Sequence, residues 1–218
     1  ELCRNNYLQK LKKKNSKTLN YFVELLDKKI EIYDKYRPRY NKKAIDDFIK
    51  YTKLNINKST IADIGSGTGI LTRQLLKHKP KKLYSIDMDS DMIEFSKSKS
   101  KSEHIIGSSN KTTLPDNSVD IITIGTAIHW FEPKSTIKEF KRILKPNGYI
   151  AIFRVSKGFK NHGIELYKGE VDIWNSLNYK GHSKQKRYDK EWKSLIDDMG
   201  FYSIVNRENY KKIKLKNY

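Results

Sequence analysis

Between residues 60 and 155, short apolar segments alternate with segments of helical periodicity about ten residues long. The apolar segments have the length of β-strands and are bounded by turn residues such as Gly, Asp and Ser. Strands that alternate with helices form a parallel sheet, because each helix returns the chain across one face before the next strand begins. The pattern predicts a doubly wound, mostly parallel α/β sheet of the Rossmann-like class. The predicted strands are TIADIG (60–65), KLYSID (82–87), HIIGS (104–108), VDIITIG (119–125) and GYIAIFRV (148–155), and the predicted helices are 68–78, 90–99 and 133–145.

Three parts of one domain follow from this pattern: a helical arm or lid over 1–53, a core over 54–155 and a substrate-side segment over 156–218. In the arm, helical spacing is visible within 7–34 and again over 41–53, and Pro38 separates the two because proline disfavours helix around it. The last segment holds a predicted helix at 189–199 and the strand-like FYSIV (201–205).

Composition narrows the class of protein. Cys3 is the single cysteine, which fits a reducing, cytoplasmic compartment, and no run of about 18 apolar residues predicts a membrane helix. The net charge is +20, but Arg occurs only eight times among 45 basic residues. Because base and phosphate readout uses Arg as well as Lys, this bias favours a solvated lysine surface over a nucleic-acid footprint. Neither His nor Cys has metal-ligand spacing, so no metal site is predicted, and His104 is expected to face solvent ahead of the third strand.

The first predicted strand ends in the glycine-rich turn ADIGSGTG (62–69). Gly65, Gly67 and Gly69 allow the backbone to pass close to a ligand where a helix begins. Ile70 stands where a dinucleotide fingerprint needs its third glycine, so the turn differs from that motif. Asp87 ends the second strand, where a carboxylate accepts both hydroxyls of a ribose; alternatively, it caps the helix that begins near Ser90.

The fourth predicted strand ends at Gly125 and is followed by TAIHWF. Ligands bind at the carboxyl ends of strands in such sheets, so Gly125 should lie beside a bound ligand and the aromatic residues should form the side of that site. A histidine with its ordinary pKa could act as a general base; the alternatives are that His129 orients the substrate or packs as a structural residue. Trp130 is expected to define the shape of the pocket.

Taken together, ADIGSGTG, SIDMDSDMI, LPDNSVDIIT and RILKPNGYIAI resemble class I S-adenosylmethionine-dependent methyltransferases. YDKYRPRY and GTAIHWF resemble the small-molecule branch that includes trans-aconitate methyltransferase-like proteins, with a type 11 methyltransferase domain. The resemblance implies that Asp63, Gly65, Ser66 and Gly67 contact the methionine moiety of the cofactor, Asp87 the ribose and Met88 the adenine. It places Asn110 where the family usually has an acidic residue facing the adenine amino group, with Ser108 and Ser109 contributing backbone contacts.

An aromatic and cationic patch follows the first helices and consists of Tyr33, Tyr36, Arg37 and Tyr40. It could simply pack against the sheet edge. The family resemblance instead implies a lid over the cofactor, in which aromatic faces stabilise the sulfonium cation and Arg37 pairs with the cofactor carboxylate.

The sequence therefore predicts an enzyme that transfers a methyl group from S-adenosylmethionine to a small molecule, a carboxylate being one candidate. His129, Tyr33 and Trp130 are the candidate catalytic residues. An RNA or protein methyltransferase and a non-catalytic cofactor-binding protein are the alternatives, and the chain is expected to be a monomer or weak dimer. Since it begins at Glu1 and lacks a convincing seventh strand after FYSIV, we expect a fragment of a longer protein.

Overall fold

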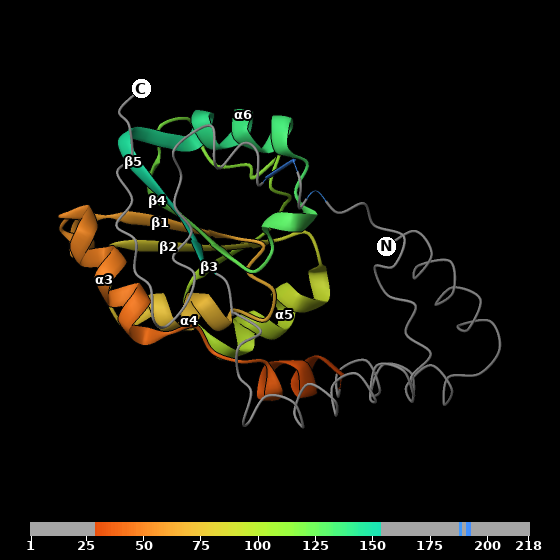
Figure 1. Cartoon of the computed structure of the whole chain (residues 1–218). Helices are drawn as coiled ribbons and strands as arrows, with labels where there is room; N and C mark the ends of the chain where they lie inside the picture. The colour runs from red at the N-terminus through yellow and green to blue at the C-terminus, as the bar shows by residue number, and fades with distance from the viewer. Residues whose placement is uncertain (1–28, 154–187, 189–190, 193–218) are drawn as a thin grey trace. The chain divides into compact units, whose positions relative to one another are not determined.

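The computed structural model describes residues 29–153, 188, 191 and 192. The chain divides into two compact units, Glu1–Arg37 and Pro38–Tyr218. In the first unit, residues 29–36 are helical. The second unit holds the sheet and its helices (Figure 1). Its elements in order are α3 (Lys42–Thr52), a 3₁₀ turn (Ile56–Lys58), β1 (Thr60–Ile64), α4 (Ile70–Leu76), β2 (Lys82–Asp87), α5 (Ser90–Lys99), β3 (Glu103–Ile106), β4 (Val119–Gly125), a second 3₁₀ turn (Ile128–Trp130), α6 (Pro133–Ile143) and β5 (Leu144–Phe153).

The five strands form one sheet in the order β3-β2-β1-β4-β5, and every adjacent pair is parallel. Strand β1 lies at the centre, between β2 and β4. This confirms the predicted Rossmann-like α/β class. The strand order reverses between β1 and β4, and the crevice outside the carboxyl ends of the strands at such a point is where doubly wound sheets bind ligands.

Helices cover both faces of the sheet, with α3, α4 and α5 on one side and α6 on the other (Figure 1). The sequence sorts its apolar residues between these faces because successive side chains of a strand point in opposite directions. In β1, Ile61 packs with α3 and α4, whereas Ala62 packs in the cluster that contains Phe140 of α6. All three side chains are buried.

Side chains at the helix ends explain where the helices begin. Asn41 caps α3 by accepting from the N–H of Lys43 at 2.9 Å, and Glu132 caps α6 with Pro133 in its first turn. Asp89 caps α5 by accepting from the N–H groups of Asp91 and Met92. These caps satisfy N–H groups that have no partner inside the helix.

The expected boundaries shift by a few residues. The helix predicted over 68–78 is α4, Ile70–Leu76, and the helix predicted over 133–145 ends at Ile143. Strand β5 begins at Leu144, four residues before the predicted start, and its pairing with β4 is irregular near Ile121. The predicted helix at 189–199, apart from the helical residues 191 and 192, and the strand FYSIV lie outside the described residues, as do most of 1–53 and of 156–218.

The expectation that His104 faces solvent is wrong. His104 lies inside β3 opposite Ser85 and is half-buried. Its Nε2 atom lies 3.1 to 3.3 Å from the hydroxyls of Ser96, Ser100 and Ser102. Burial lowers the pKa of this imidazole, since the charged form loses water.

None of the described helices has the length and apolar content needed to cross a membrane.

A buried carboxylate fastens α6 to the loop after β3. Glu139 Oε1 accepts from the backbone N–H and the hydroxyl of Thr112, at 2.8 and 2.6 Å. Arg142 donates to both carboxylate oxygens and also pairs with Asp116. The Arg142 guanidinium, together with Thr112, lowers the pKa of Glu139 from 4.5 to about 2 despite burial.

This network predicts an acid-sensitive contribution to stability. Because the folded pKa of Glu139 lies below its unfolded value, the contribution is complete above pH 4.5 and is lost as the pH falls toward 2. We expect Glu139→Gln to lower the free energy of unfolding by about 1–2 kcal/mol at pH 7 and by much less near pH 3. Urea unfolding at both pH values measures the difference, and Lys138→Gln, an exposed change on the same helix, should be neutral at both. A Glu139→Gln cost that is equal at the two pH values contradicts this assignment.

Candidate functional site

The glycine-rich turn joins β1 to α4 at the carboxyl edge of the sheet. Gly65, Gly67 and Gly69 all have positive φ, at 69°, 55° and 79°. The N–H groups of Gly65 and Ser66 both donate to the carbonyl of Ile86, at 2.8 and 3.0 Å. Because Ile86 lies in β2, the turn of one strand is held by the end of its neighbour.

The three glycines serve different purposes. A Cβ on Gly65 would lie 2.6 Å from Ala127 Cβ, and one on Gly69 would lie 2.4 Å from the Ser96 hydroxyl. Those two positions are packed against protein. A Cβ on Gly67 would meet no atom of the described residues within 4 Å, so this part of the structure leaves the turn open at Gly67.

Asp87 stands beside this opening, at the end of β2. Its Oδ2 accepts from the N–H of Gly67 at 2.8 Å and its Oδ1 accepts from the N–H of Asp89 at 2.9 Å. Burial raises the pKa of Asp87, partly offset by these two N–H groups. Since Asp89 caps α5, the alternative of Asp87 as the helix cap is wrong. A carboxylate has about four acceptor positions, so Asp87 retains room for two further hydroxyl donors.

Met88 follows directly and is 62% exposed. Its predicted contact with adenine stays a prediction.

The side chain of Asp63 is buried within the sheet and does not face the open side of the turn. Its side chain has no exposed surface, and its carboxylate accepts from the hydroxyls of Thr72 at 2.6 Å and Thr123 at 3.1 Å. Ser85 is opposite Asp63 in β2 and lies 3.3 Å from Thr72. Burial raises the pKa of Asp63 from 3.8 to about 6, because these hydroxyls only partly replace water. Its predicted contact with the cofactor stays a prediction, and in this structure the side chain braces β1, β4 and α4.

A tyrosine occupies the close-approach position at Gly125. A Cβ there would lie 2.5 Å from the Tyr40 hydroxyl, which is 3.3 Å from the Thr126 hydroxyl. Gln74 fixes the Tyr40 backbone with two hydrogen bonds, at 3.0 and 2.8 Å. Thr126 has φ 56°, a strained value for a β-branched residue and one that is frequent at functional sites.

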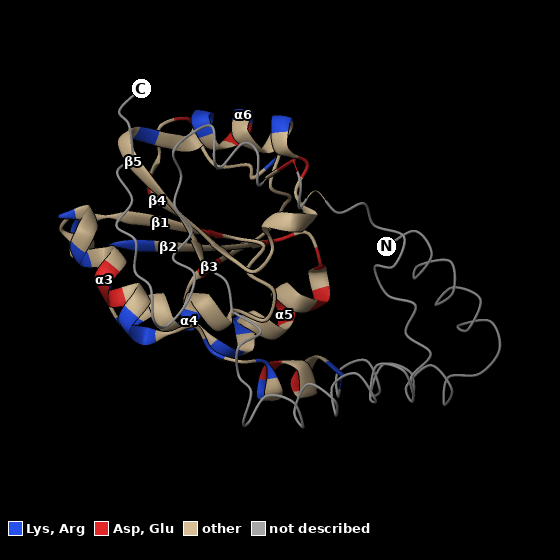
Figure 2. Cartoon of the chain, viewed as in Figure 1, with Lys and Arg blue, Asp and Glu red and all other residues tan. Residues whose placement is uncertain are grey.

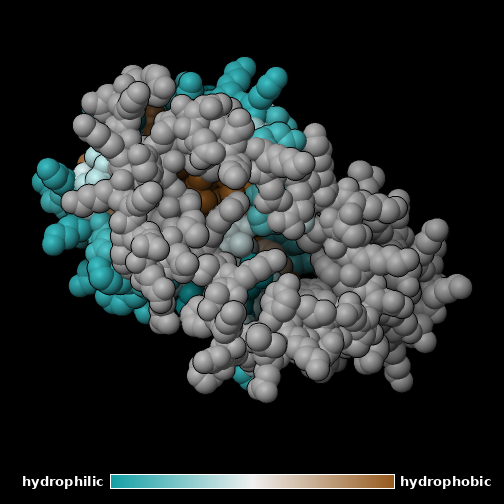
Figure 3. Space-filling view, in the orientation of Figure 1, coloured by the Kyte–Doolittle hydropathy of each residue, from teal (hydrophilic) through white to brown (hydrophobic). Residues whose placement is uncertain are grey.

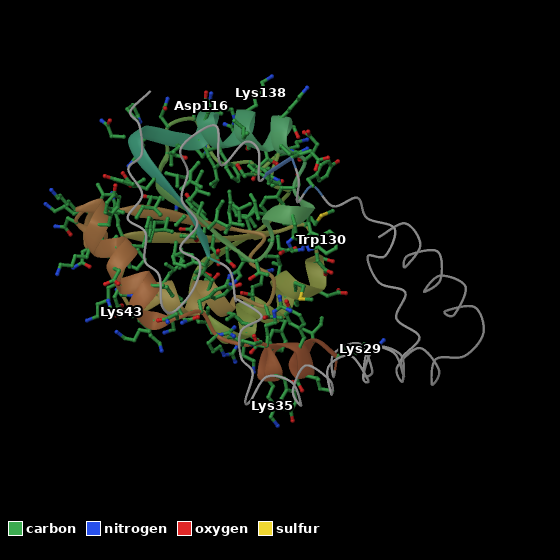
Figure 4. The ribbon with its side chains drawn as sticks, viewed as in Figure 1. Lys29, Lys35, Lys43, Asp116, Trp130 and Lys138 are labelled. Atoms are coloured by element: carbon green, nitrogen blue, oxygen red, sulfur yellow. The ribbon has the colours of Figure 1, made fainter. Side chains whose placement is uncertain are left out.

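The aromatic residues after β4 differ in burial. Phe131 is buried, with a ring atom 2.9 Å from the Cβ position of Gly65, and its carbonyl accepts from Trp192 Nε1 at 2.8 Å. His129 and Trp130 are only half-buried, with ring centroids 4.6 Å apart. Figure 4 labels Trp130, the last residue of the second 3₁₀ turn. The side chains of His129 and Trp130 thus keep exposed surface, whereas Phe131 packs against the glycine-rich turn.

The loop after β3 carries the remaining predicted contacts. Ser109 is buried and its hydroxyl lies 2.9 Å from that of Thr136. Asn110 is exposed; its Oδ1 accepts from the Ser108 hydroxyl at 2.6 Å and its Nδ2 lies 3.4 Å from Ser135. Their roles toward a base stay predictions.

The predicted lid residues Tyr33, Tyr36 and Arg37 belong to the first compact unit. There Arg37 lies over the ring of Tyr33, 5.3 Å from its centroid, and Tyr36 is 41% exposed. Their roles over the cofactor stay predictions.

Sequence reasoning missed several supporting residues: Thr72, Gln74, Ser96, Thr123 and Trp192. Each acts through a partner at least eight residues away in the chain. The one available signal was polar residues inside otherwise apolar segments, at Thr72 in α4 and Thr123 in β4.

Two buried hydroxyls in the turn lack partners among the described residues, and these are Ser66 Oγ and Thr68 Oγ1. Buried polar groups without partners are uncommon, and a polar ligand is one way to satisfy them. Together with open Gly67 and acceptor Asp87, they fit a ligand with hydroxyl donors and polar groups, as a nucleoside cofactor has. No group of three metal-binding side chains occurs in the described part of the chain.

The contrast between Gly65 and Gly67 gives a prediction. Gly65→Ala should lower the free energy of unfolding by about 3 kcal/mol, because it combines overpacking with positive φ. Gly67→Ala, with similar φ and no clash, should cost about 1 kcal/mol and thereby serves as the matched control. Chemical unfolding of both variants measures this, and equal costs would contradict the packing of Phe131 and Ala127 on the turn.

Comparison with known proteins matches residues 62–152 to the family model described as a methyltransferase domain. An uncharacterised methyltransferase of Schizosaccharomyces pombe is 33% identical over 119 residues, which are 54% of this chain and 45% of that protein. A malonyl-[acyl-carrier protein] O-methyltransferase of a Marinomonas species is 27% identical over 168 residues, 73% of this chain and 58% of that protein. The chain thus spans about half the length of the curated relatives it matches.

Solved structures agree on the fold. A crystal structure of an S-adenosylmethionine-dependent methyltransferase from Aquifex aeolicus is similar, with 26% identity and a TM-score of 0.50 over 68% of this chain and 85% of that one. A methyltransferase structure from Methanococcus maripaludis has 21% identity and a TM-score of 0.51 over 83% of this chain and 84% of that one. The trans-aconitate branch is not singled out and stays a prediction. Residues 62–152 thus match the methyltransferase-domain family model, and the sheet is similar in fold to a solved S-adenosylmethionine-dependent methyltransferase.

Proposed function

We propose that this chain binds S-adenosylmethionine at the glycine-rich turn and transfers its methyl group to a small-molecule acceptor. The observation that carries the proposal is the open backbone at Gly67 beside the Asp87 carboxylate, which together offer close approach to the turn and an acceptor for the hydroxyls of a nucleoside. The buried, unpartnered hydroxyls of Ser66 and Thr68 support it.

The cofactor supplies an electrophilic methyl group, which a nucleophilic oxygen takes as the carbon–sulfur bond breaks and both electrons remain on sulfur. The chain contributes position, since a direct displacement needs nucleophile, carbon and leaving atom in line. Asp87 and Met88 would hold the nucleoside end, while His129 and Trp130 would form the side of the pocket that faces the acceptor. In the lid role, Tyr33 and Tyr36 would place ring faces near the cation and Arg37 would pair with the carboxylate of the cofactor.

A carboxylate is the acceptor that the comparisons favour. The Marinomonas relative is named as an O-methyltransferase acting on malonyl-[acyl-carrier protein], and a malonyl group carries a free carboxylate. A carboxylate is already ionised at neutral pH, so its methylation requires no general base. His129 would then orient the acceptor rather than remove a proton.

The role of Asp87 is testable without knowledge of the acceptor. Wild-type protein should bind S-adenosylhomocysteine about tenfold or more tightly than its 2′-deoxy analogue, because a hydrogen bond to a charged group contributes about 1.5–3 kcal/mol. Asp87→Ala should weaken binding of S-adenosylhomocysteine and abolish the discrimination between the two compounds, as measured by isothermal titration calorimetry.

Asp89→Ala is the matched control. It removes the cap of α5 beside the site but leaves Asp87 in place, so the ratio of the two affinities should be unchanged. If Asp87→Ala weakens both compounds by the same factor, Asp87 has only a structural role in the turn. If the wild-type protein binds neither compound, the proposed function is wrong.

The acceptor class requires a turnover assay. Incubation with S-adenosylmethionine carrying a labelled methyl group and a panel of carboxylic acids, phenols, amines, RNA and protein should label a carboxylic acid. His129→Gln should then raise the KM of that acid more than it lowers the turnover rate, and the pH profile should lack a limb near the pKa of histidine. If His129→Gln instead slows turnover by about 100-fold or more and leaves KM unchanged, His129 is a general base.

Label in RNA or protein instead would support the alternative of a macromolecular methyltransferase. Tight cofactor binding with no labelled product in any class would support a non-catalytic cofactor-binding protein.

A further inference from the structure

The loops at the two ends of strands β1, β2 and β3 differ in their balance of charge. At the carboxyl end, the turns hold Asp87, Asp89, Asp91 and Glu132. At the amino end, the loops that precede β1, β2 and β3 hold a group of exposed lysines, which we call the lysine edge: Lys53, Lys58, Lys77, Lys79, Lys81 and Lys101. Figure 2 shows blue at the left-hand ends of the strands and red toward their right-hand ends. A uniform lysine coat does not produce this asymmetry.

Within the described part of the chain, no lysine of the lysine edge has a carboxylate partner. Lysines elsewhere in the same unit do: Lys42 pairs with Asp46 at 2.6 Å, Lys43 with Asp47 at 2.7 Å and Lys145 with Asp120 at 2.9 Å. The acidic residue nearest in sequence to the lysine edge is Glu103, and Lys82 already pairs with it. The lysine edge is therefore a concentration of uncompensated positive charge.

Two of these lysines occupy backbone positions that disfavour them. Lys53 and Lys79 have φ of 54° and 55°, in the left-handed region that favours Gly and Asn. This chain does place Asn at other left-handed positions, Asn117 and Asn147. Lysine near a helix C-terminus interacts favourably with the helix dipole, which accounts for Lys77 and Lys79 after α4. The same argument applies to Lys53 after α3 and Lys101 after α5, but it does not account for Lys58 and Lys81.

We propose that the lysine edge binds the phosphate backbone of single-stranded nucleic acid. The loops that carry it precede three neighbouring strands, and neighbouring strands are about 4.8 Å apart, so the ammonium groups can follow a chain of phosphates. Lysines act as flexible point charges, which suits contact with phosphate without reading of sequence.

A membrane surface fits less well. Among the described residues, Tyr51 is the one large exposed hydrophobic side chain close in sequence to the lysine edge, two residues before Lys53, whereas Met88 and Ile106 lie at the carboxyl ends of β2 and β3. The described surface at the left margin is largely hydrophilic in Figure 3. Peripheral membrane segments usually combine positive charge with apolar anchors.

The lysine edge is separate from the site of methyl transfer. A strand of five residues, such as β1, is about 17 Å long, and the lysine edge and the glycine-rich turn lie at its opposite ends. Nucleic acid bound at the lysine edge would leave the turn open, so this inference goes beyond the proposed function and does not depend on it.

The first test compares two triple variants with the same change of net charge. Lys77→Gln, Lys79→Gln and Lys81→Gln remove three lysines from the lysine edge, whereas Lys134→Gln, Lys138→Gln and Lys141→Gln remove three exposed lysines from α6. Figure 4 shows Lys138 projecting outward from α6. The probe is a fluorescent 20-nucleotide oligouridylate, and its binding to the full chain is followed by fluorescence anisotropy at several salt concentrations.

We expect the lysine-edge triple variant to bind at least tenfold more weakly than wild type, with a slope of log K against log salt smaller by about 2. The α6 triple variant should stay within threefold of wild type. Equal losses in the two variants would indicate that net charge alone drives binding, and no binding by the wild type would overturn the proposal outright.

A second variant separates binding from folding. Lys53→Asn with Lys79→Asn should raise the thermal midpoint of unfolding, because Asn tolerates the left-handed backbone, and should still weaken oligouridylate binding about fivefold. A misfolded variant cannot show both results. Unchanged oligouridylate binding in this variant would contradict the assignment to nucleic acid. A second contradicting result would be that wild type and the α6 triple variant bind phosphatidylserine vesicles equally well and that oligouridylate does not displace them.

Discussion

The carbonyl oxygen of Ile86 receives the N–H groups of both Gly65 and Ser66, and the rest of the site depends on this junction. It fixes the turn of β1 to the end of β2, one residue before Asp87. The Asp87 carboxylate then accepts from the N–H of Gly67 at 2.8 Å. Strands β1 and β2 therefore position both the open backbone at Gly67 and the carboxylate of Asp87 beside it. Such a turn needs positive φ at alternate positions, and glycine adopts that conformation at little steric cost. The pairing of β1 with β2 and the geometry of the glycine-rich turn are therefore fixed by the same hydrogen bonds.

The third strand of this arrangement, β4, contributes through packing. Ala127 and Phe131 press against Gly65, and the indole of Trp192 holds the Phe131 carbonyl. Tyr188 donates its backbone N–H to the His129 carbonyl at 2.9 Å. The backbone of the aromatic segment is thus fixed at two carbonyls, while the side chains of His129 and Trp130 remain half-exposed. Fixed backbone under accessible side chains is what a substrate wall requires.

Two buried carboxylates show how neighbours decide charge. Glu139 and Asp63 are both buried and both accept hydrogen bonds from threonine hydroxyls. The pKa of Glu139 falls to about 2 because Arg142 supplies an opposite charge, whereas the pKa of Asp63 rises to about 6 because burial is met only by neutral donors. As the pH rises from 3.8 to about 6, the unfolded chain loses the Asp63 proton before the folded chain does, so the free energy of unfolding falls over that range and stays lower above it. The buried Asp63 carboxyl in the central strand β1 thus lowers the stability of the fold, two residues before the glycine-rich turn begins at Gly65.

The sequence by itself determined the class of fold and the location of the glycine-rich turn and Asp87. Alternating apolar and amphipathic segments predict a parallel sheet, and G-x-G-x-G after a strand, with an aspartate at the end of the next strand, marks the turn and its acceptor. These are local signals, since each is written within a few residues of one strand end. Only the tertiary structure decided the rest. Three outcomes depend on neighbours that lie between two and more than 60 residues away in the chain. They are the choice of Asp89 over Asp87 as the cap of α5, the contact of Asp63 with two threonines, and the burial of Phe131 among the aromatic residues of HWF. The direction of a side chain is settled by its packing partners, and the sequence does not record which partners the fold will bring.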